Sequence, residues 1–101
     1  MDGKQIIDYL NSLVVDLDKL PQAFGDEFLK AVKQKTPVES GTLQQGWNLD
    51  VEGPVIEVSN EVPYAHFVED GTEKMAPVGM LKATILEAPQ ILDRAWKKVR
   101  K

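Results

Sequence analysis

The chain has 101 residues, of which 43% are hydrophobic and 28% charged, close to the average of globular domains. This length predicts one domain spanning residues 1–101 with a single core, and the composition excludes fibrous and disordered classes. Because there is no cysteine, disulfides, thiolate metal sites and cysteine nucleophiles are excluded. We see neither a secretory signal pattern nor an apolar run near the ~20 residues that cross a membrane, so we expect neither export nor membrane insertion.

The net charge of -4 is distributed unevenly along the chain. Residues 1–35 are nearly neutral, residues 36–73 hold eight acidic and no basic residues, and residues 74–101 hold seven basic and two acidic residues. One interpretation is a solvated surface whose basic last turn complements a helix dipole. The other is head-to-tail self-association, in which the acidic face of one copy meets the basic end of the next and the contacts close into a ring. The sequence leaves both open.

Apolar residues recur every three or four positions from Ile6 to Leu20 and predict a helix over residues 3–19. The stripe continues to Val32, but Pro21 removes an amide donor and Gly25 loosens the next turn. We therefore expect a kink or two consecutive helices, ending before Thr36-Pro37.

The segment after this helix allows two interpretations. Thr36 to Glu39 has the pattern of a capping box, whereas Ser40-Gly41 predicts a turn. Residues 42–45 are expected to form a short helical turn before Trp47, whose indole is large enough to anchor a core.

Alternating apolar and polar residues predict two strands, over residues 47–51 and 56–59. The residues between them, Glu52-Gly53-Pro54, predict a hairpin turn. The strands should form a small antiparallel sheet with one buried face.

Pro63 can begin a short helix that Gly71 ends, and this helix should turn Tyr64, Phe67 and Val68 toward the sheet. Residues 72–78 lack periodicity and predict an exposed loop.

Residues 80–86 form an apolar stretch that is either a third strand or the opening of the last helix. Pro89 suits the first turn of a C-terminal helix, whose stripe contains Ile91, Leu92, Ala95, Trp96 and Val99. The predicted fold class is α+β: an N-terminal helix or kinked helix pair and a C-terminal helix packed on a small antiparallel sheet.

Catalytic patterns are scarce. His66 and Glu69 have the i, i+3 spacing that could hold one divalent metal on a helix, but no second histidine completes a site. A surface histidine beside acids is the better interpretation, and a hydrolase using His66 ranks below every non-catalytic function. We predict no enzyme, no cofactor and no metal site.

The basic C-terminus raises the question of nucleic-acid binding. The whole chain is acidic, with a pI near 4.9, and no recognition motif accompanies the basic residues. We expect no specific nucleic-acid binding.

Two blocks, Lys35 to Trp47 and Asn60 to Thr72, together resemble a family signature in their order and spacing. They are similar to the small tail-component or tail-completion proteins of long-tailed bacteriophages, which include minor tail and head-to-tail joining proteins. The resemblance covers residues 35–85 well and the flanking helices in outline. The residues that match are Thr36, Pro37, Gly41, Leu43, Trp47, Asn60, Pro63, Tyr64, Ala65, Glu69, Gly71 and Thr72.

The resemblance implies helices packed on an antiparallel sheet and a structural role without catalysis. Among the matching residues, the glycines supply turns, and Leu43, Trp47 and Tyr64 are expected in the core. Glu69 either accepts hydrogen bonds that hold the following loop or faces a neighbouring subunit. The chain departs from the family at Gln44 and Gln45, where a basic residue is common, and in the segment after Pro77, whose path we leave open.

The implied function is that of a virion protein that acts in tail completion or head-to-tail joining, assembled as a ring at the tail or neck. Its partners would be itself and other tail or neck proteins, in the virion and, during assembly, in the host cytoplasm. The alternative is a monomeric protein-binding adaptor of a prophage with no place in the particle. Candidate assembly contacts are Glu69, Asp70, Glu73, Lys97, Lys98, Arg100 and Lys101.

Overall fold

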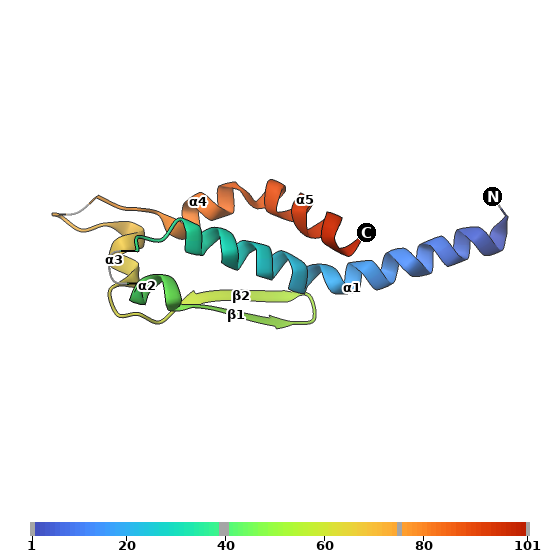
Figure 1. Cartoon of the computed structure of the whole chain (residues 1–101), viewed down its shortest axis with the longest axis horizontal. Helices are drawn as coiled ribbons and strands as arrows, with labels where there is room; N and C mark the ends of the chain where they lie inside the picture. Colours follow the sequence, from blue (N-terminus) through green and yellow to red (C-terminus); the bar gives the residue numbers. More distant parts are fainter. Residues whose placement is uncertain (1, 39–40, 75, 101) are drawn as a thin grey trace.

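One long helix organises the molecule. The computed structural model describes residues 2–38, 41–74 and 76–100. Helix α1 (Gly3–Gln34) runs along the long axis, with α5 (Ala88–Val99) on one side and a hairpin of β1 (Trp47–Glu52) and β2 (Val55–Asn60) on the other (Figure 1). The short helices α2 (Thr42–Gln45), α3 (Ala65–Asp70) and α4 (Met80–Leu86) gather at the end of α1 away from the N-terminus. The predicted α+β class with a small antiparallel sheet is confirmed.

Helix α1 is continuous through Pro21, so the two-helix alternative is wrong. Proline removes one backbone hydrogen bond, but packing against the rest of the protein begins at the same level and offsets that loss. Gly25 is buried, and a Cβ there would lie 2.9 Å from the Cδ1 atom of Leu49. The glycine therefore lets the hairpin approach the helix closely. At the N-terminus, Asp2 and Gln5 form a reciprocal capping box.

The hairpin matches its prediction. The strands are antiparallel, with Leu49 opposite Val58 and Val51 opposite Ile56 on the inner face. Gly53 has a φ of 55°, and a positive φ at the first of two turn residues is typical of a tight hairpin turn. The predicted turn and the short α2 helix are both confirmed.

The core lies where all the elements meet, around Trp47, which is 5% exposed. Its indole Nε1 donates a hydrogen bond to the Oγ1 atom of Thr36 at 2.8 Å, and that hydroxyl donates to the carbonyl oxygen of Val32 at 2.7 Å. Thr36 thus ends α1 and does not cap a following helix; the Glu39 half of the alternative capping box lies outside the described residues. The buried members of the cluster are Phe28, Ala31, Val32, Leu43, Trp47, Ala65, Met80 and Ile91.

The face of α3 that was predicted to be buried is largely exposed. Tyr64 and Phe67 are 41% and 46% exposed, while Ala65 is buried and Val68 packs against the edge of the core. The helix packs against α4 rather than under the sheet, and at that close approach the small side chain of Ala65 fits. The helix begins at Ala65, two residues after Pro63, and ends at Gly71 as predicted.

The apolar stretch after the loop is helical. Residues 80–86 form α4, which buries Met80 and Thr84, and Pro89 stands in the first turn of α5. The described residues of the preceding loop, 72–74 and 76–78, are exposed as predicted. Helix α5 buries Ile91 and Ala95 against α1, whereas Leu92 stays 46% exposed.

The molecule is much longer than it is wide. Its extents are 65 × 21 × 18 Å and its radius of gyration is 17.7 Å, against about 13 Å for a compact domain of this length. A helix of 32 residues is about 48 Å long, so α1 reaches beyond the elements that pack on it (Figure 1). Its N-terminal part projects alone.

We predict that Thr36→Val lowers the free energy of unfolding by about 1–3 kcal/mol, because the indole N–H of Trp47 loses its buried acceptor. Urea unfolding followed by circular dichroism measures the change. The same experiment on Trp47→Phe and on the double variant completes the comparison. The free energies of unfolding lost in the two single variants should sum to more than the loss in the double variant. Fully additive losses would contradict the proposed coupling.

Candidate assembly surfaces

The residues of the family signature gather at one end of the molecule. Beside the bond between Thr36 and Trp47, the Asn60 side chain donates to the carbonyl oxygen of Leu43 at 2.8 Å and accepts from the backbone N–H of Val62 at 3.0 Å. These contacts join α2, the end of β2 and the chain leading to α3. The signature therefore fixes a junction between elements.

Gly46 belongs to this junction, although the sequence analysis did not single it out. A Cβ at this position would lie 2.6 Å from Cγ2 of Val62 and 2.8 Å from Oδ1 of Asn60. Only glycine leaves room for the asparagine that ties α2 to β2. The sequence signal was its place directly before Trp47, at the change from helix to strand.

Glu69 holds α4 in place. Its two carboxylate oxygens accept hydrogen bonds from the backbone N–H groups of Leu81 at 2.7 Å and Lys82 at 3.2 Å, in the first turn of α4. The N-cap residue of α4, Gly79, has no side chain to do this, so a carboxylate from α3 satisfies the free amides and the positive end of the helix. This is the first of the two roles considered for Glu69.

The remaining signature residues divide between turns and surface. Gly41 and Gly71 have φ values of 72° and 80°, a region that favours glycine. Tyr64 was expected in the core but is exposed. Its exposed companions from the signature are Pro37, Pro63 and Thr72.

A shallow pocket of about 190 Å³ opens beside this junction. His66 is exposed at its rim and its ring lies 3.9 Å from that of Phe67, while both oxygens of Glu69 are engaged by α4. Within the described ranges no three His, Cys, Asp or Glu residues are placed to hold a metal ion. The lining residues are Trp47, Asn60, Ala65, His66, Glu69, Asp70, Met80 and Leu81.

The cations of α5 largely find partners within the same chain. Arg100 pairs with Asp16 at 2.7 Å and lies 5.6 Å from the centre of the Tyr9 ring, while Lys98 pairs with Glu27 at 3.3 Å. Lys97 pairs with Asp93, one turn earlier in its own helix. The pairs of Lys98 and Arg100 join α5 to α1, and no local pattern in the sequence indicates them because the partners lie far apart in the chain.

The other candidate assembly contacts also differ in availability. Asp70 pairs with Lys82 at 3.1 Å, and Glu73 is exposed in the loop and forms no ion pair within the described part of the chain. Lys101 lies outside the described residues. Of the three acidic candidate contacts, Glu69 binds the amides of α4 and Asp70 pairs with Lys82, whereas Glu73 has no ion pair in the described part of the chain.

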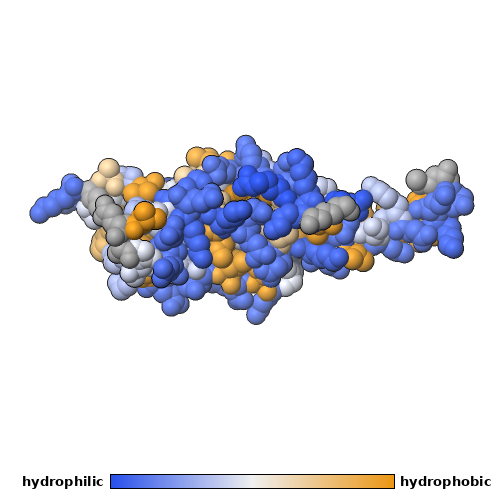
Figure 2. All heavy atoms as spheres, in the orientation of Figure 1, coloured by the Kyte–Doolittle hydropathy of each residue, from blue (hydrophilic) through white to orange (hydrophobic). Residues whose placement is uncertain are grey.

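A long apolar surface of α1 is uncovered. Five residues of its N-terminal half, Ile6, Ile7, Leu10, Val14 and Leu17, are 44–58% exposed, and Figure 2 shows hydrophobic atoms on the projecting segment. The surface continues into a groove of about 420 Å³ between α1 and α5, lined by Leu17, Leu20, Pro89, Leu92, Asp93 and Trp96. None of the helices in the described ranges has both the length and the apolar character of a membrane span.

The predicted fold class has the N-terminal helix packed on the sheet, which would cover this stripe. The signal that it is not was the shortness of the other elements, since a hairpin of two six-residue strands and a twelve-residue helix cannot cover 32 helical residues. An uncovered apolar surface of this kind is typical of a protein–protein interaction site.

We predict that Glu69→Gln lowers the free energy of unfolding by about 1–2 kcal/mol, because an amide offers one acceptor where the carboxylate offered two charged ones. Asp70→Asn is the matched control. It removes a carboxylate of the neighbouring residue from an ion pair whose side chains are 70% and 62% exposed, and such pairs contribute little. Chemical denaturation of both variants checks the difference; equal stability of the two would refute the proposed role of Glu69.

Comparison with known proteins places the chain in a family. The family described as "Bacteriophage HK97-gp10, putative tail-component" matches residues 4–71, which span most of α1, the hairpin and the α3 helix. Searches of curated proteins and of solved structures found no significant match. The family is one of tail components and not a class of enzyme. Since the match covers more than half of the chain, this protein belongs to the HK97-gp10-like family of bacteriophage tail components.

Proposed function

We propose that this protein completes the tail of a bacteriophage or prophage particle, or joins the tail to the head, as one subunit of a ring. The observation that carries the proposal is the family match over residues 4–71. The family match indicates a tail component and does not distinguish tail completion, head-to-tail joining or a ring. The contacts at the junction, the charge of the hairpin and the exposed apolar stripe of α1 support these more specific roles.

The contacts of the signature residues support a structural role. The signature residues form a braced junction in which the polar atoms of Thr36, Asn60 and Glu69 already hold neighbouring elements. They are thereby occupied with the protein's own backbone and side chains. The exposed apolar stripe of α1 adds a surface for assembly.

Charge supports contacts between subunits in one respect. On the outer face of the hairpin, Asp50 lies directly opposite Glu57, and like charges in this position destabilise a sheet. A basic surface of a neighbouring protein would relieve that repulsion. We propose this face as the acidic side of a head-to-tail contact.

The alternative function, a monomeric protein-binding adaptor with no place in the particle, uses the same exposed stripe. The two differ in whether the protein is found in purified particles. A ring subunit is retained there, whereas the adaptor is not.

Deletion of the gene from its native phage or prophage tests the proposal. We expect filled heads beside unattached or overlong tails by electron microscopy, and a large loss of infectious titre that the wild-type gene restores in trans. Normal infectious particles without the gene would reject tail completion and favour the adaptor.

A further inference from the structure

The projecting half of α1 carries a regular seven-residue pattern. Ile7, Leu10, Val14 and Leu17 follow one another at intervals of three and four, the a and d positions of a helix that packs on another helix. Further along the same helix this line reaches Phe24 and Phe28, which the body of the protein covers. We use the name free stripe for the projecting part of this line together with the flanking Ile6 and the half-buried Leu13: Ile6, Ile7, Leu10, Leu13, Val14 and Leu17.

We propose that a second copy of this chain covers the free stripe, with the two α1 helices side by side and antiparallel. In the register that matches the pattern best, Leu10 of one copy lies against Val14 of the other, and Ile7 lies against Leu17. Because the antiparallel pair has a two-fold axis, each of these contacts occurs twice. This is the regular a-to-d packing of two antiparallel helices.

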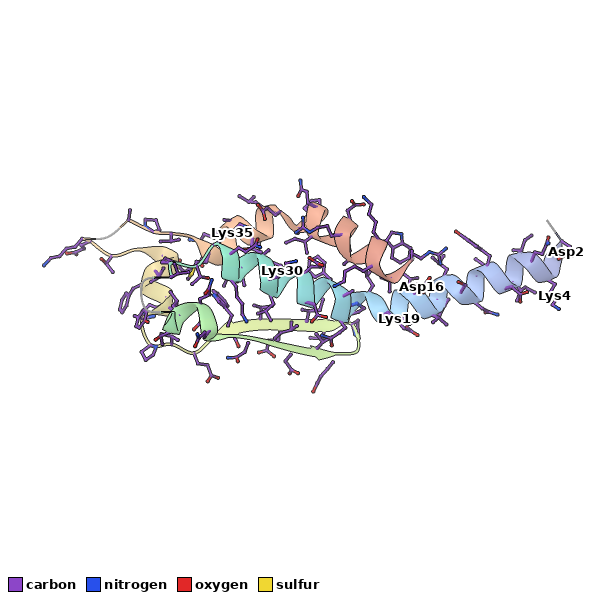
Figure 3. All side chains as sticks on the ribbon, in the orientation of Figure 1. Asp2, Lys4, Asp16, Lys19, Lys30 and Lys35 are labelled. Carbon is purple, nitrogen blue, oxygen red and sulfur yellow. The ribbon has the colours of Figure 1, made fainter. Side chains whose placement is uncertain are left out.

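Charge on the flank of the stripe selects this orientation. Lys4, Asn11 and Asp18 follow one another at seven-residue intervals along one edge, and in an antiparallel pair this edge faces itself. Lys4 then lies beside Asp18 of the second copy, and the two Asn11 side chains meet at the axis. Neither Lys4 nor Asp18 forms an ion pair within the described residues, and both are exposed. Figure 3 shows Lys4 near the free end of α1.

A parallel pair would lose this match. It would place the carboxylate of Asp18 against the apolar Leu13 of the other helix and leave Lys4 without a partner. It would also bring the two hairpins to the same level. The antiparallel pair holds the two bodies at opposite ends, because the end of α5 contacts α1 at Asp16 and Tyr9, through Arg100, to one side of the stripe.

The groove between α1 and α5 fits the same arrangement. Leu17 belongs both to the free stripe and to the groove, and Leu20 lies beside it. In the antiparallel register, Ile6 of the second copy meets Leu20 while its Ile7 meets Leu17. The N-terminal turn of each copy therefore closes the groove of the other, between α1 and α5.

The contact is small. Two helices paired over about four turns bury on the order of 1,000 Å² in total, near the lower limit of specific interfaces. We therefore expect a reversible dimer of the free protein, which forms before the protein meets other tail components. The pair does not depend on the proposed function, because an adaptor would form it equally.

Two adjacent valines provide a matched test. Val14, 56% exposed, lies in the free stripe, whereas Val15, 52% exposed, points away from it. Wild-type protein and Val15→Glu should sediment at high concentration with twice the monomer mass of 11.3 kDa, and Val14→Glu should remain monomeric. Circular dichroism should show that all three are folded, and the helical signal of Val14→Glu should fall by no more than the projecting half of α1 contributes. A monomeric wild type at every concentration, or equal dimerisation of both variants, overturns the proposal.

A thiol cross-link tests the orientation, since the chain has no cysteine of its own. Asn11→Cys lies at the two-fold axis, so a short bismaleimide should convert it to a covalent dimer. Lys4→Cys should not react in this way, because the two copies of residue 4 are roughly 21 Å apart along the axis. Cross-linking of Lys4→Cys but not Asn11→Cys overturns the antiparallel pair. The tail role itself is judged by the gene deletion alone.

Discussion

The packing of two separate layers on one helix is the constraint on which the rest of the structure depends. The hairpin and α5 lie on opposite sides of α1, and Gly25 allows the hairpin to approach while Glu27 and Asp16 receive the cations of α5. Neither layer is large enough to be stable without the helix. Both end near the middle of α1, so the same helix that organises the body also projects from it.

The residues of the family signature brace the end of the molecule opposite the N-terminus. Thr36 ends α1 and accepts the indole N–H of Trp47, so the last turn of the long helix and the first residue of the sheet share one buried hydroxyl. Asn60 and Glu69 continue the bracing to α2 and α4. A rigid end and a projecting apolar helix in one small protein suit a subunit that must fit between larger assemblies, which is the role we propose.

Local pattern was enough to predict much of the fold but not its outline. The alternation around Leu49 and Val58 and the turn at Gly53 are local signals, and they gave the hairpin correctly. The two-helix alternative at Pro21 was wrong because proline removes one hydrogen bond, whereas packing stabilises the helix through many contacts. The burial predicted for Tyr64 was wrong because helical spacing does not say which face of a helix its neighbours cover. The ion pair of Arg100 with Asp16 and the exposure of the free stripe depend on where distant elements stop, which no local pattern records.

We expect the N-terminal half of α1 to be helical and to need a second copy for its stability, because a helical segment of this length is marginally stable alone in water. Hydrogen exchange of backbone amides, measured at several protein concentrations, tests this most directly. We expect protection over residues 6–17 to rise with concentration, while protection over residues 24–34 stays constant. Protection over residues 6–17 that is independent of concentration, or absent throughout, would contradict the account.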